Sequence, residues 1–128
     1  MKKLLIILVM VLVATSLFAN TRLFVLVDLD GDRLAGGAVV EEVYRLLDQR
    51  GGFVPANLEE SDVELIINGM KIMYQGSHVG YALAATVVFH DPNLVRFSNT
   101  RVMTSRNDLD GLRWAADVSV NYLYSFFE

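Results

Sequence analysis

The C-terminal stretch, Asp108 to Glu128, predicts a helix with an unusually wide apolar side. Either Asp108 or Asp110 can cap its start, because a short carboxylate accepts a hydrogen bond from an unpaired backbone N–H of the first turn. A helix this apolar is not stable alone in water, so the preceding chain must supply a sheet on which it packs. Residues of its predicted core face recur at three- and four-residue steps: Leu112, Ala116, Val120, Leu123 and Phe127.

The N-terminus has the pattern of a targeting segment. Lys2 and Lys3 precede the apolar run from Leu4 to Val13, and small residues lead to Ala19. We expect residues 1–19 to be a signal peptide cleaved after Ala19, and the protein to be exported to the periplasm or the extracellular space. The apolar run that ends at Ala19 has 16 residues, fewer than the roughly 20 that span a membrane. An uncleaved anchor is the alternative; after cleavage, no membrane insertion is expected.

Charge and composition limit the partners of residues 20–128, which have the size of a single α/β domain. Without Lys2 and Lys3, 9 of the 11 basic residues remain against 15 acidic ones, so the net charge is about −6. An acidic chain without a basic patch argues against nucleic acid and against an anionic membrane surface as partners. The chain contains 0 cysteines, so the core must hold the fold without disulfides.

Hydrophobic periodicity predicts four strands and two helices. The first strand is apolar on both faces, which is typical of a central strand. A loop rich in Asp and Gly follows it, and Gly51-Gly52 closes the first helix. The predicted elements are the strand Arg22–Asp28, the loop Asp28–Gly37, the helix Ala38–Arg50, three strands over Ser61–Tyr74, Tyr81–His90 and Leu94–Ser105, and the C-terminal helix.

Three local features refine this pattern. Phe53-Val54-Pro55 is expected to pack under the end of the first helix, and Gly69 in mid-strand indicates a bulge or bend. Asp91-Pro92-Asn93 is a turn signal. The strand that begins at Tyr81 has one face of large residues and one of small residues, and the small face would let a helix approach closely.

The predicted fold class is α+β, with the element order β-α-β-β-β-α. Three strands joined by short turns should form an antiparallel meander, and the first strand should join it in parallel through a right-handed crossover. Two helices on one face then give a two-layer sandwich with a mixed four-stranded sheet. The other face of the sheet is less clearly protected.

This element order and three stretches of the chain resemble the N-terminal domain of the TolB translocation protein. The stretches are LLDQRGGFVPAN, SDVELIINGMKI and LDGLRWAADVSVNYLYSFF, and Leu112 to Tyr124 is the closest parallel. The chain also resembles related small envelope modules, the LpoB-type penicillin-binding-protein activators and the CsgG-type assembly proteins. No β-propeller sequence follows and no lipobox cysteine is present, which separates this chain from TolB itself and from typical LpoB-type lipoproteins. The resemblance implies a non-enzymatic protein-binding module and supplies no partner.

Asp28, Asp30 and Asp32 in VDLDGDR form a carboxylate cluster with two chemical interpretations. A calcium loop needs glycine at its sixth position and a bidentate acid at its twelfth, where this chain has Arg33 and Val39, so an EF-hand is excluded. The stretch also resembles the nucleophile strand of haloacid-dehalogenase-like phosphatases. In that case Asp28 would attack a phosphoryl group and Asp30 would act as acid and base.

Such phosphatases also need a downstream lysine and a second acidic motif to hold magnesium. Lys71 is the only lysine after the leader, and it lies in the middle of a predicted strand. A turn that caps the first helix is the simpler interpretation of the cluster. His78 and His90, the only histidines, lack the spacing of a metal set, so no cofactor is expected.

Aromatic side chains are the better candidates for contact with a partner. Trp114 and Tyr124 border the polar stripe of the C-terminal helix, and Tyr74 and Tyr81 flank one turn. Large aromatic side chains that remain exposed often anchor protein contacts. The sequence therefore favours a non-catalytic, exported protein-binding module, for example an assembly or activator accessory, that binds another envelope protein or itself through a sheet edge or an uncovered face. The alternative is a small cation-dependent hydrolase or cation-binding protein that uses Asp28, Asp30 and Asp32.

Overall fold

The computed structural model describes residues 21–90 and 97–127. The predicted signal peptide and the predicted turn at Asp91-Pro92-Asn93 lie outside these residues. The described chain forms five strands, two α-helices and one short 3₁₀ helix. In chain order these are β1 (Thr21–Leu29), α2 (Arg33–Arg50), β2 (Phe53–Pro55), η1 (Leu58–Glu60), β3 (Val63–Tyr74), β4 (Ser77–Phe89), β5 (Phe97–Arg106) and α3 (Leu109–Ser125).

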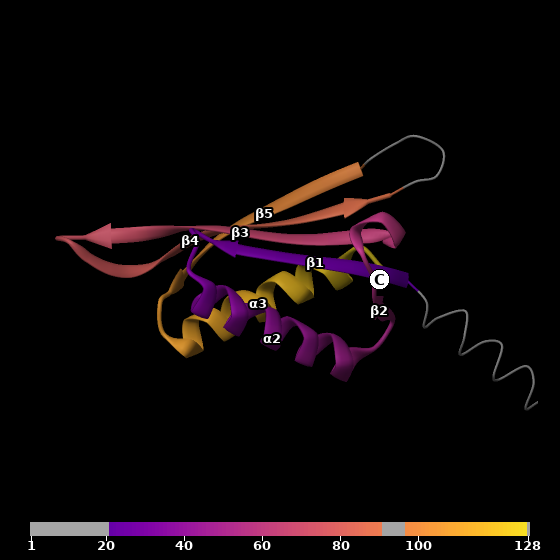
Figure 1. The fold of residues 1–128 in the computed structure, drawn as a ribbon, viewed down its shortest axis with the longest axis horizontal. Helices are drawn as coiled ribbons and strands as arrows, with labels where there is room; N and C mark the ends of the chain where they lie inside the picture. The colour runs from indigo at the N-terminus through magenta and orange to yellow at the C-terminus, as the bar shows by residue number, and fades with distance from the viewer. Residues whose placement is uncertain (1–20, 91–96, 128) are drawn as a thin grey trace, which may run out of the picture.

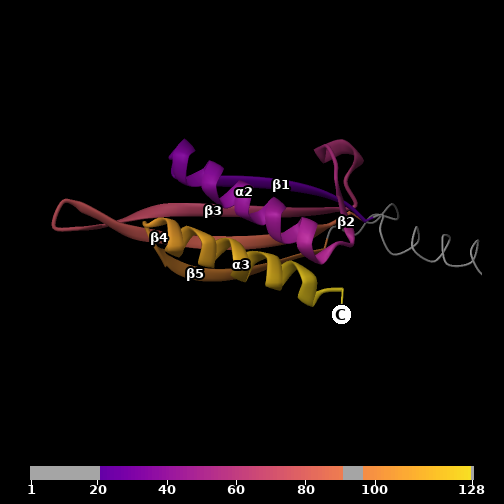
Figure 2. The ribbon, with the colours of Figure 1, turned by 90° about the horizontal axis from the view of Figure 1, so that it is seen from below.

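The strands form one mixed sheet in the order β2-β1-β3-β4-β5. β1 is parallel to β3, and β3, β4 and β5 form an antiparallel meander, which confirms the predicted connections. Both helices lie on the same face of the sheet, α2 beneath β1 and α3 beneath β4 and β5 (Figures 1 and 2). The α+β fold class is therefore confirmed, but the sheet has five strands rather than the predicted four.

The additional strand is β2, formed by Phe53-Val54-Pro55. Phe53 and Pro55 lie beside Leu47 and Asp48 near the end of α2, as predicted, but the pairing of this segment with β1 was not predicted. β2 pairs in parallel with Thr21, Arg22 and Leu23, at the start of β1. The Phe53 ring makes edge contacts with the rings of Tyr124 and Phe127, with centroids 5.2 and 5.1 Å apart. A three-residue strand with a single inward aromatic side chain carries too little alternation to be recognised from sequence.

The first helix begins earlier than its predicted start at Ala38. The Asp32 carboxylate accepts a hydrogen bond from the Ala35 N–H at 3.1 Å, so the cap lies inside the stretch that was predicted to be a loop. Gly36 and Gly37 are then part of the helix despite their low helix propensity, because the cap and the packing of the helix on the sheet outweigh that propensity.

The predicted irregularity at Gly69 is displaced along the strand. The register shift of the β3–β4 pair lies between Ile72 and Met73, and Gly69 pairs regularly with Leu83. A Cβ atom on Gly69 would lie 2.7 Å from Cδ2 of Leu29. Gly69 is therefore not a bulge. It is a position where the side chains of Leu29 and Leu83, on two other strands, come close to the backbone.

The core lies between the two helices and the face of the sheet that carries large residues. On β4 the large side chains of this face are buried, whereas the face with Ala82 and Ala84 has no helix on it, which reverses the prediction that a helix packs on the small residues. The helices pack on the face with large residues because burial of large apolar side chains removes more apolar area from water, and so contributes more free energy, than burial of alanines. The largest fully buried side chains include Leu23, Leu29, Leu65, Ile67, Tyr81, Leu83, Val87, Val39, Val43, Val120 and Leu123.

Two helical glycines offer a matched test of this packing. A Cβ atom at Gly111, in the first turn of α3, would lie 2.4 Å from the Arg106 carbonyl oxygen, whereas one at Gly37 in α2 meets nothing within 4 Å. We expect Gly111→Ala to lower the free energy of unfolding by about 1–3 kcal/mol, because backbone must move. We expect Gly37→Ala to raise it by about 0.5–1 kcal/mol. Urea denaturation measures both, and equal effects of the two substitutions would contradict the close approach of α3 to the end of β5.

Candidate interaction surface

The three aspartates of the β1–α2 loop are each used within the loop and its neighbours. The Asp28 carboxylate accepts from the Gly31 N–H at 3.2 Å, and the Asp30 carboxylate accepts from the Lys71 N–H of β3 at 3.2 Å. Asp32 caps α2 and also accepts from the Tyr81 hydroxyl at 2.7 Å. Among the described residues, no group of three His, Cys, Asp or Glu side chains is placed to hold a metal ion.

Asp32 and Tyr81 form a polar link between the α2 cap and the centre of the sheet. The hydrogen bond from the Tyr81 hydroxyl, followed by that from the Ala35 N–H, lowers the pKa of Asp32. Burial, followed by the hydrogen bond to Asp32, raises the pKa of Tyr81 to about 12. Tyr81 is only 1% exposed, so its ring belongs to the core and is withdrawn from the candidate contact residues.

The Tyr81–Asp32 bond makes stability depend on alkaline pH. The unfolded chain releases the Tyr81 proton near pH 10 and the folded chain near 12, so the free energy of unfolding of the wild type should fall as the pH rises from about 10 to about 12. Tyr81→Phe should lower stability by about 1 kcal/mol near pH 8, because the hydrogen bond from the buried Tyr81 hydroxyl to the Asp32 carboxylate is lost. The variant should also lack this alkaline loss. Urea denaturation at about pH 8 and about pH 11 checks both effects, and an identical alkaline loss in the two proteins would contradict the link.

The two histidines bond within the sheet. His90 Nε2 lies 2.7 Å from a carboxylate oxygen of Glu64, which is buried, and His78 Nε2 lies 2.9 Å from the Gly80 carbonyl oxygen. They lie at opposite ends of β4, so they do not join in one site.

The remaining three aromatic candidates are separated in space. The Tyr124 hydroxyl donates to the Gly51 carbonyl oxygen at 2.5 Å, and the Arg50 guanidinium lies 3.8 Å from the centroid of its ring. Tyr124 therefore fastens α3 to the end of α2. Tyr74 is 64% exposed on the β3–β4 hairpin, which projects beyond both helices (Figure 1). Trp114 is 49% exposed and borders a hollow between α3 and β5.

The face of the sheet opposite the helices has no packed layer on it in the described part of the chain (Figure 1). Strand alternation places every second residue of β1, β3, β4 and β5 on this face. Its most exposed apolar side chains are Met70, at 71%, and Val102, at 75%, beside a shallow hollow over Ala82 and Ala84. The prediction that this face is less protected is thus confirmed. By this alternation its side chains include the polar Asp28, Glu64, Asn68, Thr86, Ser98, Thr100 and Thr104 and the apolar Phe24, Leu26, Ile66, Met70, Ala82, Ala84, Val88 and Val102.

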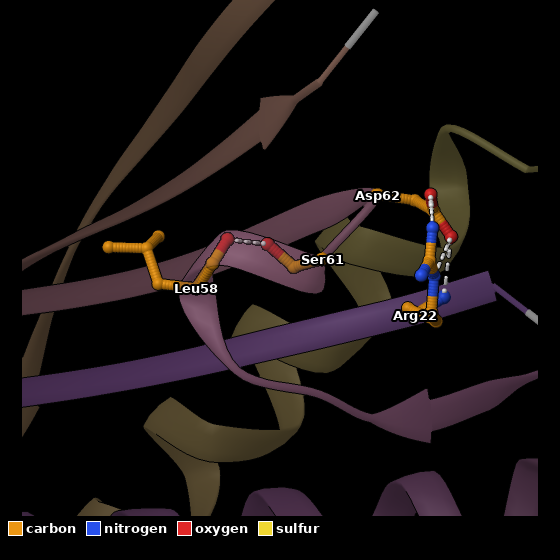
Figure 3. A network of polar contacts seen from close by, with 4 residues as sticks. All are labelled: Arg22, Leu58, Ser61 and Asp62. Atoms are coloured by element: carbon orange, nitrogen blue, oxygen red, sulfur yellow. Dashed lines mark hydrogen bonds and ion pairs between the residues drawn. The ribbon is translucent and has the colours of Figure 1, made fainter. Parts of the chain in front are cut away.

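The sheet also has two edges of different character. β5 is bonded to β4 on one side only, and β2 covers just the start of β1 on the other edge. Figure 3 shows how that second edge is fixed: Arg22 donates to the Asp62 carboxylate from its backbone N–H and from Nε and Nη2, at 3.0, 3.3 and 3.1 Å. This contact lowers the pKa of Asp62 and fastens the start of β1 to the residues before β3. The Ser61 hydroxyl donates to the Leu58 carbonyl oxygen at 2.8 Å and closes η1.

Sequence reasoning did not identify the open part of the β1 edge. The available signal was the apolar character of Arg22–Asp28 on both faces, which predicts strands on both sides. None of the described helices is long and apolar enough to cross a membrane.

Comparison with known proteins shows a similarity of fold alone. No protein-family model and no curated protein matches this chain. The fold is similar to that of a PelC dodecamer from Paraburkholderia phytofirmans, a single-residue variant, with a TM-score of 0.50 and 16% identity over 83% of this chain and 86% of that chain. A minor lipoprotein from Acinetobacter baumannii aligns with a TM-score of 0.36 and 14% identity over 80% of this chain and 87% of its own. The resemblance to the TolB N-terminal domain stays a prediction.

Proposed function

We propose that the chain is a non-catalytic module of the cell envelope, exported by its N-terminal segment, whose function is to assemble with further copies of itself. The observation that carries this proposal is the sheet, which among residues 21–90 and 97–127 has helices on one face only and an open strand at each edge. The proposal is supported by PelC, a protein of similar fold that was solved as a dodecamer.

The uncovered face favours binding over catalysis. Its centre combines apolar and small side chains, such as Met70, Val102 and Ala84, with threonines, and contiguous exposed apolar surface of this kind marks protein contacts. By contrast, the one carboxylate cluster is committed to backbone N–H groups and to Tyr81. Those bonds position the α2 cap, which is a structural role. A hydrolase would instead need these carboxylates for its substrate.

Assembly can be tested on the full-length chain exported by a bacterial host and purified from its envelope. Native mass spectrometry and sedimentation over a wide range of protein concentration should show closed oligomers in preference to monomers. Chemical crosslinking in intact cells should capture the same species before lysis. A protein that stays monomeric at all concentrations and is crosslinked to no copy of itself would refute the proposal.

A further inference from the structure

The outer edge of β1 has unpaired backbone groups in the middle of the strand. Asp62 donates its backbone N–H to the Arg22 carbonyl oxygen, on the β3 side, and Ala56 donates to the Leu23 carbonyl oxygen, on the outer side. Because backbone groups alternate along a strand, Val25 and Val27 also direct their N–H and C=O groups outward. β2 reaches only to Leu23, so no strand of the described chain pairs with this part of β1.

The composition of this segment is that of an interior strand rather than an edge. Phe24, Val25, Leu26 and Val27 are all apolar, and natural edge strands instead carry charges, proline or bulges that prevent further pairing. Val25 and Val27 lie on the helix side of the sheet and are still partly exposed. A strand with apolar residues on both faces and an open edge is a template for another strand.

The space beside the open edge of β1 can accommodate another strand. The first turns of α2 extend outside β1 before the helix crosses beneath the sheet (Figure 2). There α2 presents Gly36 and Gly37, with Val40 beside them, and these residues line a hollow together with Val27. Gly36 is buried and lies close to β1, since a Cβ atom there would lie 3.8 Å from the Val27 carbonyl oxygen, whereas a Cβ atom at Gly37 would meet nothing within 4 Å. The exposed Gly37 therefore leaves open space beside the outer edge of β1 for a further strand.

We propose that β5 of a second copy occupies this position, so that copies join head to tail through β5 of one and β1 of the next. This inference rests on the proposed self-assembly and specifies its interface. β5 is the other open edge of the sheet, and the sheet topology makes it run in the same direction as β1. A contact between two different edges is a heterologous contact. Repeated heterologous contacts form a closed ring when the rotations between successive copies add up to a full turn.

Charge favours β5 over a second β1 as the occupant. β5 carries Arg101 and Arg106 and no acidic residue; Arg106 lies 3.5 Å from the Asp108 carboxylate, so Arg101 is the basic residue on which this argument depends. The hollows along the β1 edge are lined by Asp28, Asp32 and Asp48 with a single basic residue, so two β1 edges would bring like charges together.

The flanking apolar side chains also match. Beside β5 stands Trp114, half exposed next to Thr104 and Ser105. On the other side of the molecule, α2 exposes Leu34, at 89%, in its first turn, and Tyr44, which lines a hollow together with Leu23 of β1. In a head-to-tail contact the Trp114 side of one copy faces the α2 side of the next, which buries an aromatic anchor against apolar residues.

Disulfide crosslinking tests the interface directly, because the chain has 0 cysteines of its own. Leu26 and Thr100 occupy one level of the sheet and its uncovered face, with Val102 two residues further along β5. Copies carrying Leu26→Cys are mixed with copies carrying Thr100→Cys or Val102→Cys and oxidised. We expect a disulfide with at least one β5 position, since paired strands bring Cβ atoms within bonding reach. A chain with both cysteines should give a ladder beyond the dimer.

Ala84→Cys on central β4, on the same face, is the matched control. Crosslinks of Leu26→Cys with itself, or of Ala84→Cys with itself at the same yield, would overturn the head-to-tail interface. An oligomeric protein without the β1–β5 crosslink overturns this inference and leaves self-assembly standing, whereas a monomeric protein overturns both.

A charge reversal gives an independent measurement. Arg101→Glu should raise the dissociation constant of the assembly at least about tenfold, because it places an acidic residue against the acidic β1 edge. Arg113→Glu makes the same change in the groove between α2 and α3, away from both edges, and should leave the constant nearly unchanged. An effect of Arg101→Glu no larger than that of Arg113→Glu would count against β5 as the occupant.

Discussion

The packing of both helices on one face of the sheet is the constraint on which the other features depend. The large side chains of β1, β3 and β4 alternate onto that face, and α2 and α3 each provide an apolar stripe to cover them. With no third layer on the described chain, the opposite face stays bare. The chain has no disulfides, so this one core holds the fold, and a change in the helix positions would alter both the core and the exposed edges.

Polar contacts at the two ends of β1 set the geometry of its open edge. At one end, Arg22 and Asp62 join the start of β1 to β3, and β2 with η1 folds over the same end. At the other end, Asp32 bonds to Tyr81 and caps α2, which holds the first turns of the helix beside the strand. The segment between these contacts, Phe24 to Val27, is therefore anchored at both ends, while the outward backbone groups of Val25 and Val27 have no strand paired with them in the described chain. A preformed edge costs little ordering entropy when a partner strand binds.

Much of the fold could be predicted from the sequence, because the strand and helix periods are strong and the caps are conventional. The meander, the parallel first strand and the placement of α3 follow from Leu112, Val120 and similar positions. β2 could not be predicted, since three residues show no period, and the start of α2 was hidden because Asp32 caps a segment that contains two glycines. For the site, Trp114 was recognised as a surface aromatic, but Tyr81 and Tyr124 could not be assigned, because their hydroxyl partners, Asp32 and Gly51, are distant in sequence.

One disagreement between sequence and structure is itself informative. The pattern of Arg22–Asp28 predicts strands on both sides, and the described chain supplies one along Leu23–Leu29 and only three residues of another. An apolar strand at an open edge exposes a protein to uncontrolled pairing, so a stable protein must cover such an edge. A second copy of the same chain is always present at the concentration of the first, and it brings an open, basic strand. In the proposed assembly the bare sheet face is continuous from one copy to the next, which gives the assembly a surface that no single copy possesses.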